Sequence, residues 1–163
     1  MNTGITKKLK LSTEREKALK AFQKARKLQD ANDLGYVKCI SCGAIIHVSE
    51  ADGGHFIPRQ FKATELEPSN VNAQCRECNR FEAGNQIGYR KGLIEKYGEA
   101  EEKRLENLHD AARGSEEAYN SLPEEDKALI YSKRTAQYYH SEYLKWNKAC
   151  NQLAERERIL RVP

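Results

Sequence analysis

The sequence lacks any long apolar run: no stretch of its 163 residues approaches the roughly 20 consecutive apolar residues that a membrane-spanning helix requires. It also lacks a hydrophobic signal segment at its start, so we expect no transfer to an oxidising compartment. Internal repeats and low-complexity stretches are absent as well. We therefore expect a cytoplasmic protein without a membrane partner, built as one domain or as a small core with helical extensions.

A large excess of charge of one sign is missing too, because the net charge is only +4 although 32% of the residues are charged. The positive charge is unevenly distributed along the chain. Residues 1–38 carry ten Lys and Arg against four Asp and Glu, whereas residues 39–98 balance at seven each. A basic arm or helix can neutralise DNA phosphates without reading the bases. Charge alone leaves open whether this segment binds DNA or is a solvated helix face.

Cysteine is the informative residue type that is present. Four of the five cysteines form two Cys-x-x-Cys pairs, Cys39 with Cys42 and Cys75 with Cys78, a pattern typical of structural zinc. Zinc ribbons that only bind DNA or protein usually have about 15–20 residues between the pairs. Here 32 residues (43–74) intervene, which is room for a hairpin and a loop. Disulfide bonds are the weaker alternative, and the fifth cysteine, Cys150, is predicted to be a buried free thiol.

Helices are expected on both sides of these cysteine pairs. Thr13 and Glu16 form a capping-box pattern that opens a basic helix, which we expect to end at Gly35. Two more helices are expected over about residues 99–113 and 121–158, the second with an aromatic stripe that indicates core or dimer packing.

Between the flanking helices, strand-like composition predicts a β-hairpin over residues 44–58, with its return strand at residues 55–57. An irregular loop should follow over residues 59–74, and a helix should run from Cys75 to Gly98. The order of knuckle, hairpin, loop, knuckle and helix predicts an α+β fold with a small zinc-stabilised ββα-metal finger. The expected parts are a basic tail and N-terminal helix (1–38), the finger (39–98) and a helical C-terminal region (99–163).

Such a finger could hydrolyse phosphodiester bonds. This chemistry needs an activated water, a Lewis acid on the phosphate and relief of charge on the leaving oxygen. His55 follows two glycines that let a bulky phosphate approach, and a neutral histidine can act as a general base. Asn79, directly after Cys78, offers a hard oxygen ligand of the kind that suits Mg²⁺ or Mn²⁺.

The motifs resemble those of known nucleases. The strings Cys39-Ile-Ser-Cys42-Gly43, Asp52-x-Gly54-His55-Phe56 and Asn70-Val71-x-x-Gln74-Cys75-x-x-Cys78-Asn79, with Gly84-Asn85-x-x-x-Tyr89-Arg90-x-x-Leu93-Ile94, resemble the lambdoid phage NinG (Rap) recombination endonucleases. The likeness covers about residues 14–98. The arrangement also resembles the HNH nuclease superfamily, and its four-cysteine frame is similar to that of endonuclease VII.

The HNH resemblance implies a role for each site residue. His55 would be the general base, Asn70 the central asparagine of the catalytic motif, acting by fixing the loop, and Asn79 a ligand of the catalytic ion. Many HNH enzymes place a further ligand directly before the base, where this chain has glycine. Asp52 is the nearest acidic candidate for that ligand, and Asn85 is another candidate for binding the metal or a phosphate.

The same resemblance implies a metal-dependent endonuclease that cuts branched DNA, such as Holliday junctions or D-loops, during phage recombination. Because a resolvase cuts two strands symmetrically, a homodimer is expected. Candidate DNA contacts are Lys7, Lys8, Lys10, Arg59, Arg76, Arg80 and Arg90. The alternatives are a less selective HNH nickase and a non-catalytic zinc-finger DNA-binding or scaffold protein.

Overall fold

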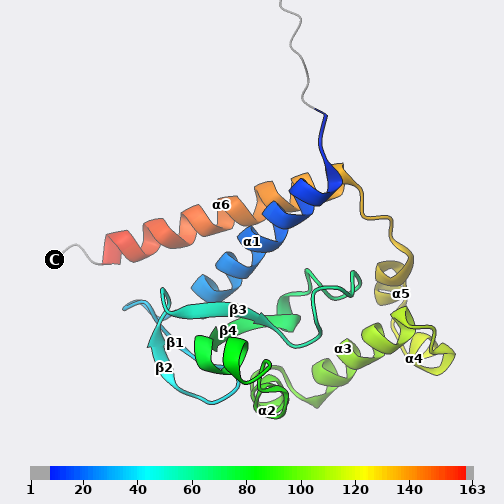
Figure 1. Ribbon diagram of the computed structural model, residues 1–163, viewed down its shortest axis with the longest axis horizontal. Helices are drawn as coiled ribbons and strands as arrows, with labels where there is room; N and C mark the ends of the chain where they lie inside the picture. The colour runs from blue at the N-terminus through cyan, green and yellow to red at the C-terminus, as the bar shows by residue number, and fades with distance from the viewer. Residues whose placement is uncertain (1–7, 161–163) are drawn as a thin grey trace, which may run out of the picture.

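The computed structural model describes residues 8–160, with side chains described up to residue 155. Figure 1 shows two long helices, α1 (Leu11–Gln29) and α6 (Ala136–Leu160), packed against each other, with α1 also lying against the strands. Helices combined with small strands confirm the predicted α+β class.

The pairing of α1 with α6 rests on the apolar face of α1. Leu19 and Phe22 are buried on this face, and the Phe22 ring meets Trp146 of α6 edge-on, with ring centroids 4.8 Å apart. Further along α6, the thiol of Cys150 donates a hydrogen bond to the carbonyl of Ala21 at 3.4 Å. Cys150 is buried and makes no disulfide, which confirms the prediction of a buried free thiol.

The limits of α1 differ from those predicted. The N-cap is Lys10, whose carbonyl accepts the first helical hydrogen bond from Glu14, so the helix starts ahead of the expected cap Thr13. α1 ends at Gln29, and Gly35, with φ of 79°, lies in the turn before the first strand instead of at the helix end. A positive φ suits a turn glycine in either place, so its presence alone does not locate the end of a helix.

The strands form two separate antiparallel pairs, β1 (Tyr36–Lys38) with β2 (Ile45–His47) and β3 (Ala51–His55) with β4 (Val71–Cys75). The predicted hairpin over residues 44–58 is therefore wrong, because β2 and β3 are consecutive but pair with different strands. The first knuckle explains the difference. It brings the amide of Cys39 to the carbonyl of Ala44 at 2.8 Å and closes β2 onto β1, which leaves β3 to pair with β4.

β4 was predicted as part of an irregular loop, and that prediction is wrong. Asn72 and Gln74 give this strand a polar composition, yet both side chains are fully buried. The Asn72 oxygen accepts hydrogen bonds from Lys96 at 2.8 Å and from the Tyr97 hydroxyl at 2.9 Å. Gln74 donates to the carbonyl of Gly84 at 2.6 Å. Asn72 and the nitrogen of Gln74 are paired in this way, whereas the Gln74 oxygen has no hydrogen-bond partner among the described residues. Buried polar groups are tolerated when they are paired, and sequence periodicity does not show the pairing.

The helix predicted from Cys75 to Gly98 is two elements, a short π-helix η2 (Glu77–Phe81) and α2 (Gln86–Tyr97). Between them, Ala83, Gly84 and Asn85 all have positive φ, at 48°, 87° and 40°. Three left-handed residues in succession cannot continue an α-helix, so the chain turns before α2 begins.

In the C-terminal region, α3 (Glu99–Ala112) confirms the helix predicted over residues 99–113. A short helix α4 (Glu116–Asn120) was not predicted. The single helix expected over residues 121–158 is α5 (Glu124–Tyr131) followed by α6, because Ser132 is extended and a linker leads from α5 to α6, which packs along α1 (Figure 1). None of the described helices is both long and apolar enough to cross a membrane.

Candidate functional site

The four cysteines of the two pairs converge although they come from distant parts of the chain. Cys39 and Cys42 lie in the turn after β1, Cys75 ends β4, and Cys78 lies in η2. Their sulfur atoms all lie within 4.8 Å of one another, and Cys39 and Cys78 are buried. Four cysteine sulfurs are the ligand set that zinc prefers in structural sites. The cluster could therefore hold a metal ion such as zinc.

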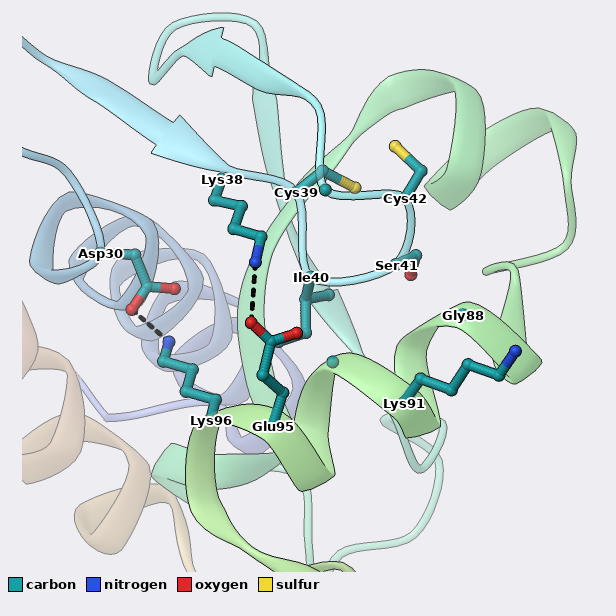
Figure 2. A pocket seen from close by; sticks show the side chains of 12 residues that line it. Asp30, Lys38, Cys39, Ile40, Ser41, Cys42, Gly88, Lys91, Glu95 and Lys96 are labelled. Atoms are coloured by element: carbon teal, nitrogen blue, oxygen red, sulfur yellow. Dashed lines mark hydrogen bonds and ion pairs between the residues drawn. The ribbon is translucent and has the colours of Figure 1, made fainter.

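Helix α2 presses directly on the backbone of the first knuckle, as Figure 2 shows beside Cys39 and Cys42. A Cβ atom at Gly88 would lie 2.3 Å from the carbonyl oxygen of Ser41, and one at Gly92 would lie 1.9 Å from that of Ile40. Only glycine permits so close an approach. The two glycines, one helical turn apart, thus fix the knuckle against α2.

Asn85 lies at the cysteine cluster and caps α2. Its side-chain oxygen accepts from the amide of Gly88 at 3.2 Å, while its side-chain nitrogen lies 3.4 Å from the Cys78 sulfur and 2.9 Å from a Glu82 carboxylate oxygen. The amide oxygen that was expected to bind the catalytic ion is therefore used as a helix cap. An N–H group directed at a cysteine sulfur supports a metal ligand from outside, in the manner of outer-shell partners at metal sites.

The structure brings together Asp52 of β3 and Asn79 of η2, the two residues that the resemblance suggests as ligands of one ion. The Asn79 side-chain nitrogen donates to Asp52 Oδ2 at 2.9 Å. Arg80 forms a bidentate ion pair with the same carboxylate, each bond 2.7 Å long. The hydrogen bonds from Arg80 are the main reason that the pKa of Asp52 lies below its usual range, and the bond from Asn79 adds to the effect. The site thus offers an ionised carboxylate and an amide oxygen, both of which suit Mg²⁺ or Mn²⁺.

His55 ends β3, and its Nε2 atom lies 3.0 Å from the backbone carbonyl of Glu65. A carbonyl can only accept, so Nε2 carries the proton and Nδ1 of the neutral ring holds the free electron pair. Burial lowers the pKa of His55; the hydrogen bond to Glu65 opposes this, and the charges of Arg59 and Arg15 add to the lowering. His55 is therefore neutral at pH 7, the state that a general base requires.

Glu65 connects His55 to the two flanking helices, a role that no sequence pattern indicated. Its carboxylate is fully buried, accepts from Arg15 Nε of α1 at 2.8 Å, and accepts a hydrogen bond from the Tyr139 hydroxyl of α6. A buried carboxylate is tolerated when it is paired in this way. The loop residue that orients His55 is thus held from both ends of the chain.

Asn70 fixes the same loop. Its side-chain oxygen accepts from the amide of Ile57 at 2.7 Å, and its nitrogen donates to the carbonyls of Ile57 and Thr64 at 3.0 and 2.9 Å. All three bonds go to the backbone of the loop between β3 and β4. Asn70 is completely buried, so it shapes the loop that carries Glu65.

A groove of about 680 Å³ opens beside Asp52 and Asn79, between α1 and the strand β3. Its cationic side chains come from α1, the loop after β3 and η2, and they are Lys20, Lys24, Lys27, Arg59 and Arg80. Arg59 lines the groove, and its charge also lowers the pKa of His55. The spacing of the lysines on α1 was visible in the sequence and could have indicated this shared surface.

The other predicted DNA contacts are spread over the molecule. Arg76 donates to the carbonyl of Ser49 at 3.1 Å, and Arg90 is paired with the carboxylates of Glu102 and Glu106. Lys8 and Lys10 are exposed just ahead of α1, and Lys7 lies outside the described residues. Of the predicted arginines, only Arg59 and Arg80 line the groove.

The chain matches one known protein family over most of its length. The family model described as "Bacteriophage Lambda NinG protein" matches residues 5–135. The chain belongs to the NinG family. Its similarity to the family covers the cysteine pairs, the groove and the helices α1 to α5, and no solved structure matches the chain significantly.

Individual NinG proteins of known phages show the same similarity. The chain is 31% identical over 88 residues to "Protein ninG" of Salmonella phage P22, which covers 53% of the chain and 43% of the relative. It is 29% identical over 93 residues to "Protein ninG" of Escherichia phage lambda, with the same coverage of each. The match to the protein of Escherichia phage 933W is 28% over 85 residues. The chain thus spans less than half the length of these relatives.

Proposed function

We propose that this chain is a metal-dependent DNA endonuclease of the HNH type. The observation that carries the proposal is the meeting of Asp52 and Asn79 at a groove rich in cations, with the neutral His55 at the end of the same strand β3. The arrangement of β3, β4 and η2 around these residues fits a ββα-metal finger. Membership of the NinG family is in accord with the proposal.

The residues present fit two metal ions. Cys39, Cys42, Cys75 and Cys78 would hold a structural zinc ion that links the two knuckles. Asp52 and Asn79 would hold Mg²⁺ or Mn²⁺, which supplies Lewis-acid stabilisation of the phosphate charge. The ion would share the carboxylate with Arg80, because Oδ1 accepts only one hydrogen bond and keeps a second acceptor site.

The roles of the side chains follow from their protonation states. His55 Nδ1 would take a proton from the attacking water, while the bond from Nε2 to Glu65 keeps the ring in that tautomer. The cations of the groove would neutralise the phosphates that flank the scissile bond. Branched DNA as the substrate and a homodimer as the active form rest on the resemblance to recombination endonucleases, and both are part of the proposal.

A cleavage assay on a four-way junction and on linear duplex of the same sequence, with and without Mg²⁺, tests this function. We expect Mg²⁺-dependent cleavage that favours the junction. His55→Ala should lose at least about 10²-fold in rate, the lower range for loss of a general base, while zinc content and DNA affinity stay near wild type. Equal cleavage of both substrates would favour the nickase, and an unimpaired His55→Ala variant would remove the HNH assignment.

A second candidate, a zinc-stabilised DNA-binding protein without catalysis, is favoured by one observation. Arg80 occupies both oxygens of Asp52, so the carboxylate already has a positive partner that is not a metal ion. This candidate predicts that DNA binds equally well with and without Mg²⁺ and that no strand is cut. Isothermal titration calorimetry with Mn²⁺ separates the two functions. The endonuclease should bind Mn²⁺, and Asn79→Ala should weaken that binding, whereas the non-catalytic protein needs no Mn²⁺ site at these residues.

A further inference from the structure

We infer that α1 forms a wall of the substrate groove and that Lys20 and Lys24 hold the phosphate backbone of the DNA strand that reaches Asp52. The inference rests on the proposed function for its substrate class. It gives α1 a role at the site, whereas the sequence placed the lysines that contact DNA in the preceding tail.

Helix α1 is fixed to the strand that carries Asp52. Gln23 donates a hydrogen bond to the carbonyl of Gly53 at 2.8 Å. A Cβ atom at Gly53 would lie 2.8 Å from both the Cβ and the backbone oxygen of Gln23, so only glycine allows this approach. The wall of the groove is therefore attached to β3 directly beside the carboxylate of Asp52, the residue that precedes Gly53.

Lys27 strengthens the same attachment. Its ammonium group donates to the carbonyl of Val48 at 3.1 Å, three residues before β3, and to that of Ala51 at 2.8 Å, at the start of β3. Burial lowers the pKa of Lys27, and the charge of Asp52 opposes that effect. The ammonium group of Lys27 thus holds α1 to the finger and is less available to a phosphate than a lysine without such bonds.

Lys20 and Lys24 are available. Lys24 makes no hydrogen bond or ion pair with any described residue, and Lys20 pairs only with Glu16 on the exposed surface of α1. An exposed ion pair of this kind contributes little and exchanges readily. The two lysines are four residues apart, roughly 6 Å along the helix axis. That spacing is close to two nucleotide steps of one DNA strand, about 6.8 Å along the duplex.

The net positive charge of the groove favours binding of a polyanion such as a DNA strand. Five cationic side chains face one carboxylate there, an excess equal to the net charge of +4 of the whole chain. The remainder of the molecule therefore has no net formal charge, whereas the groove along α1 and beside Asp52 has an excess of positive charge. A strand following this groove would pass the two predicted ligands, Asp52 and Asn79.

The salt dependence of DNA binding tests the inference. The double variant Lys20→Gln/Lys24→Gln is compared with wild type by fluorescence anisotropy on a labelled four-way junction, with Ca²⁺ in place of Mg²⁺. Loss of two phosphate contacts should lower the slope of log affinity against log salt by about two units. The matched control is Lys91→Gln/Lys103→Gln, which removes the same charge from exposed positions of α2 and α3 outside the groove. It should leave the slope within half a unit of the wild-type value.

An unchanged slope in the groove variant, an equal loss in the control, or no DNA binding by the wild-type protein would each overturn the inference. Thermal unfolding of both variants shows whether each is folded before binding is compared. The proposed function fails separately: wild-type protein that binds DNA through α1 but never cuts it with Mg²⁺ would refute the nuclease and leave the DNA-binding wall standing.

Discussion

The contact between His55 Nε2 and the carbonyl of Glu65 decides which ring nitrogen can accept a proton. A bond to a carbonyl is compatible with only one neutral tautomer, and burial disfavours the charged ring. Asp52 has the opposite electrostatic setting, since Arg80 keeps its pKa low and the carboxylate ionised. Their surroundings thus produce a neutral imidazole and an ionised carboxylate a few residues apart on one strand.

The pH dependence of cleavage should follow the lowered pKa of His55. An ordinary histidine titrates near pH 6.5. Because the pKa of His55 is lowered in the folded protein, more than half of His55 should be neutral at pH 6.5, and the single-turnover rate should decline at a lower pH than an ordinary histidine would give. The unfolded chain takes up its proton first, so the His55 contribution to stability is fully present above pH 6.5 and is lost as pH falls through the folded pKa.

This prediction is measured by single-turnover rates from pH 5 to pH 8, together with NMR titration of the histidine signals. The His55 signal is identified by its absence in His55→Ala. The control His47→Gln changes a histidine of β2, outside the groove, and should leave the rate profile unchanged. A His55 midpoint above pH 6.5 would contradict the buried, neutral state.

At the scale of elements, the contact between α2 and the first knuckle is built from glycine. Replacing glycine by alanine inside a helix ordinarily stabilises it by about 0.5–1 kcal/mol. Gly92→Ala should instead destabilise the protein by about 1–3 kcal/mol, the usual cost of overpacking, since the new methyl group would lie 1.9 Å from the Ile40 carbonyl oxygen. Chemical denaturation measures the change, and Lys91→Ala at the neighbouring exposed position should be nearly neutral. A stabilised Gly92→Ala protein would show that α2 and the knuckle do not meet so closely.

The cysteine cluster joins the end of β1, the end of β4 and η2, so its metal should be needed for folding. Purified protein should contain about one zinc ion per chain, and Cys78→Ser should lose the ion and unfold the finger, because metal binding in small zinc modules supplies roughly 10 kcal/mol. Elemental analysis and circular dichroism measure both effects. Cys150→Ser is a matched control, since that cysteine is equally buried but lies between α1 and α6, and it should retain zinc. A folded, metal-free Cys78→Ser protein would contradict a structural zinc site.

At the scale of the whole molecule, α1 and α6 meet at the Glu65 carboxylate. Tyr139→Phe removes one hydrogen bond to this buried charge without changing the packing volume, which should cost about 1.5–3 kcal/mol. The maximal cleavage rate should also fall, because the Glu65 carbonyl orients His55. Unfolding free energy and the NMR shift of His55 measure these effects. Tyr138→Phe is the control, because the Tyr138 hydroxyl makes no hydrogen bond to any described residue. Equal results for the two variants would remove the role assigned to Glu65.

The sequence predicted those parts of the molecule that depend on local spacing. The two Cys-x-x-Cys pairs and the apolar face of α1 are short-range patterns, and the structure brings the cysteines together as expected. The pairing of β3 with β4 was missed, because the buried Asn72 and Gln74 look like loop residues until their partners are known. Arg15, Glu65 and Tyr139 are separated by 50 and 74 residues, and no periodicity connects positions so far apart.

The contacts of the Glu65 carboxylate determine whether the finger can be produced as an isolated fragment or inserted into another protein. A fragment of residues 39–98 would keep all four cysteines, His55, Asp52 and Asn79, but would lose both Arg15 and Tyr139. The carboxylate would then have neither of these partners, and the loop that orients the histidine would be free to rearrange. Transplanting this proposed catalytic unit into another protein therefore requires the helices from both ends of the chain, even though the recognisable motif lies wholly between them.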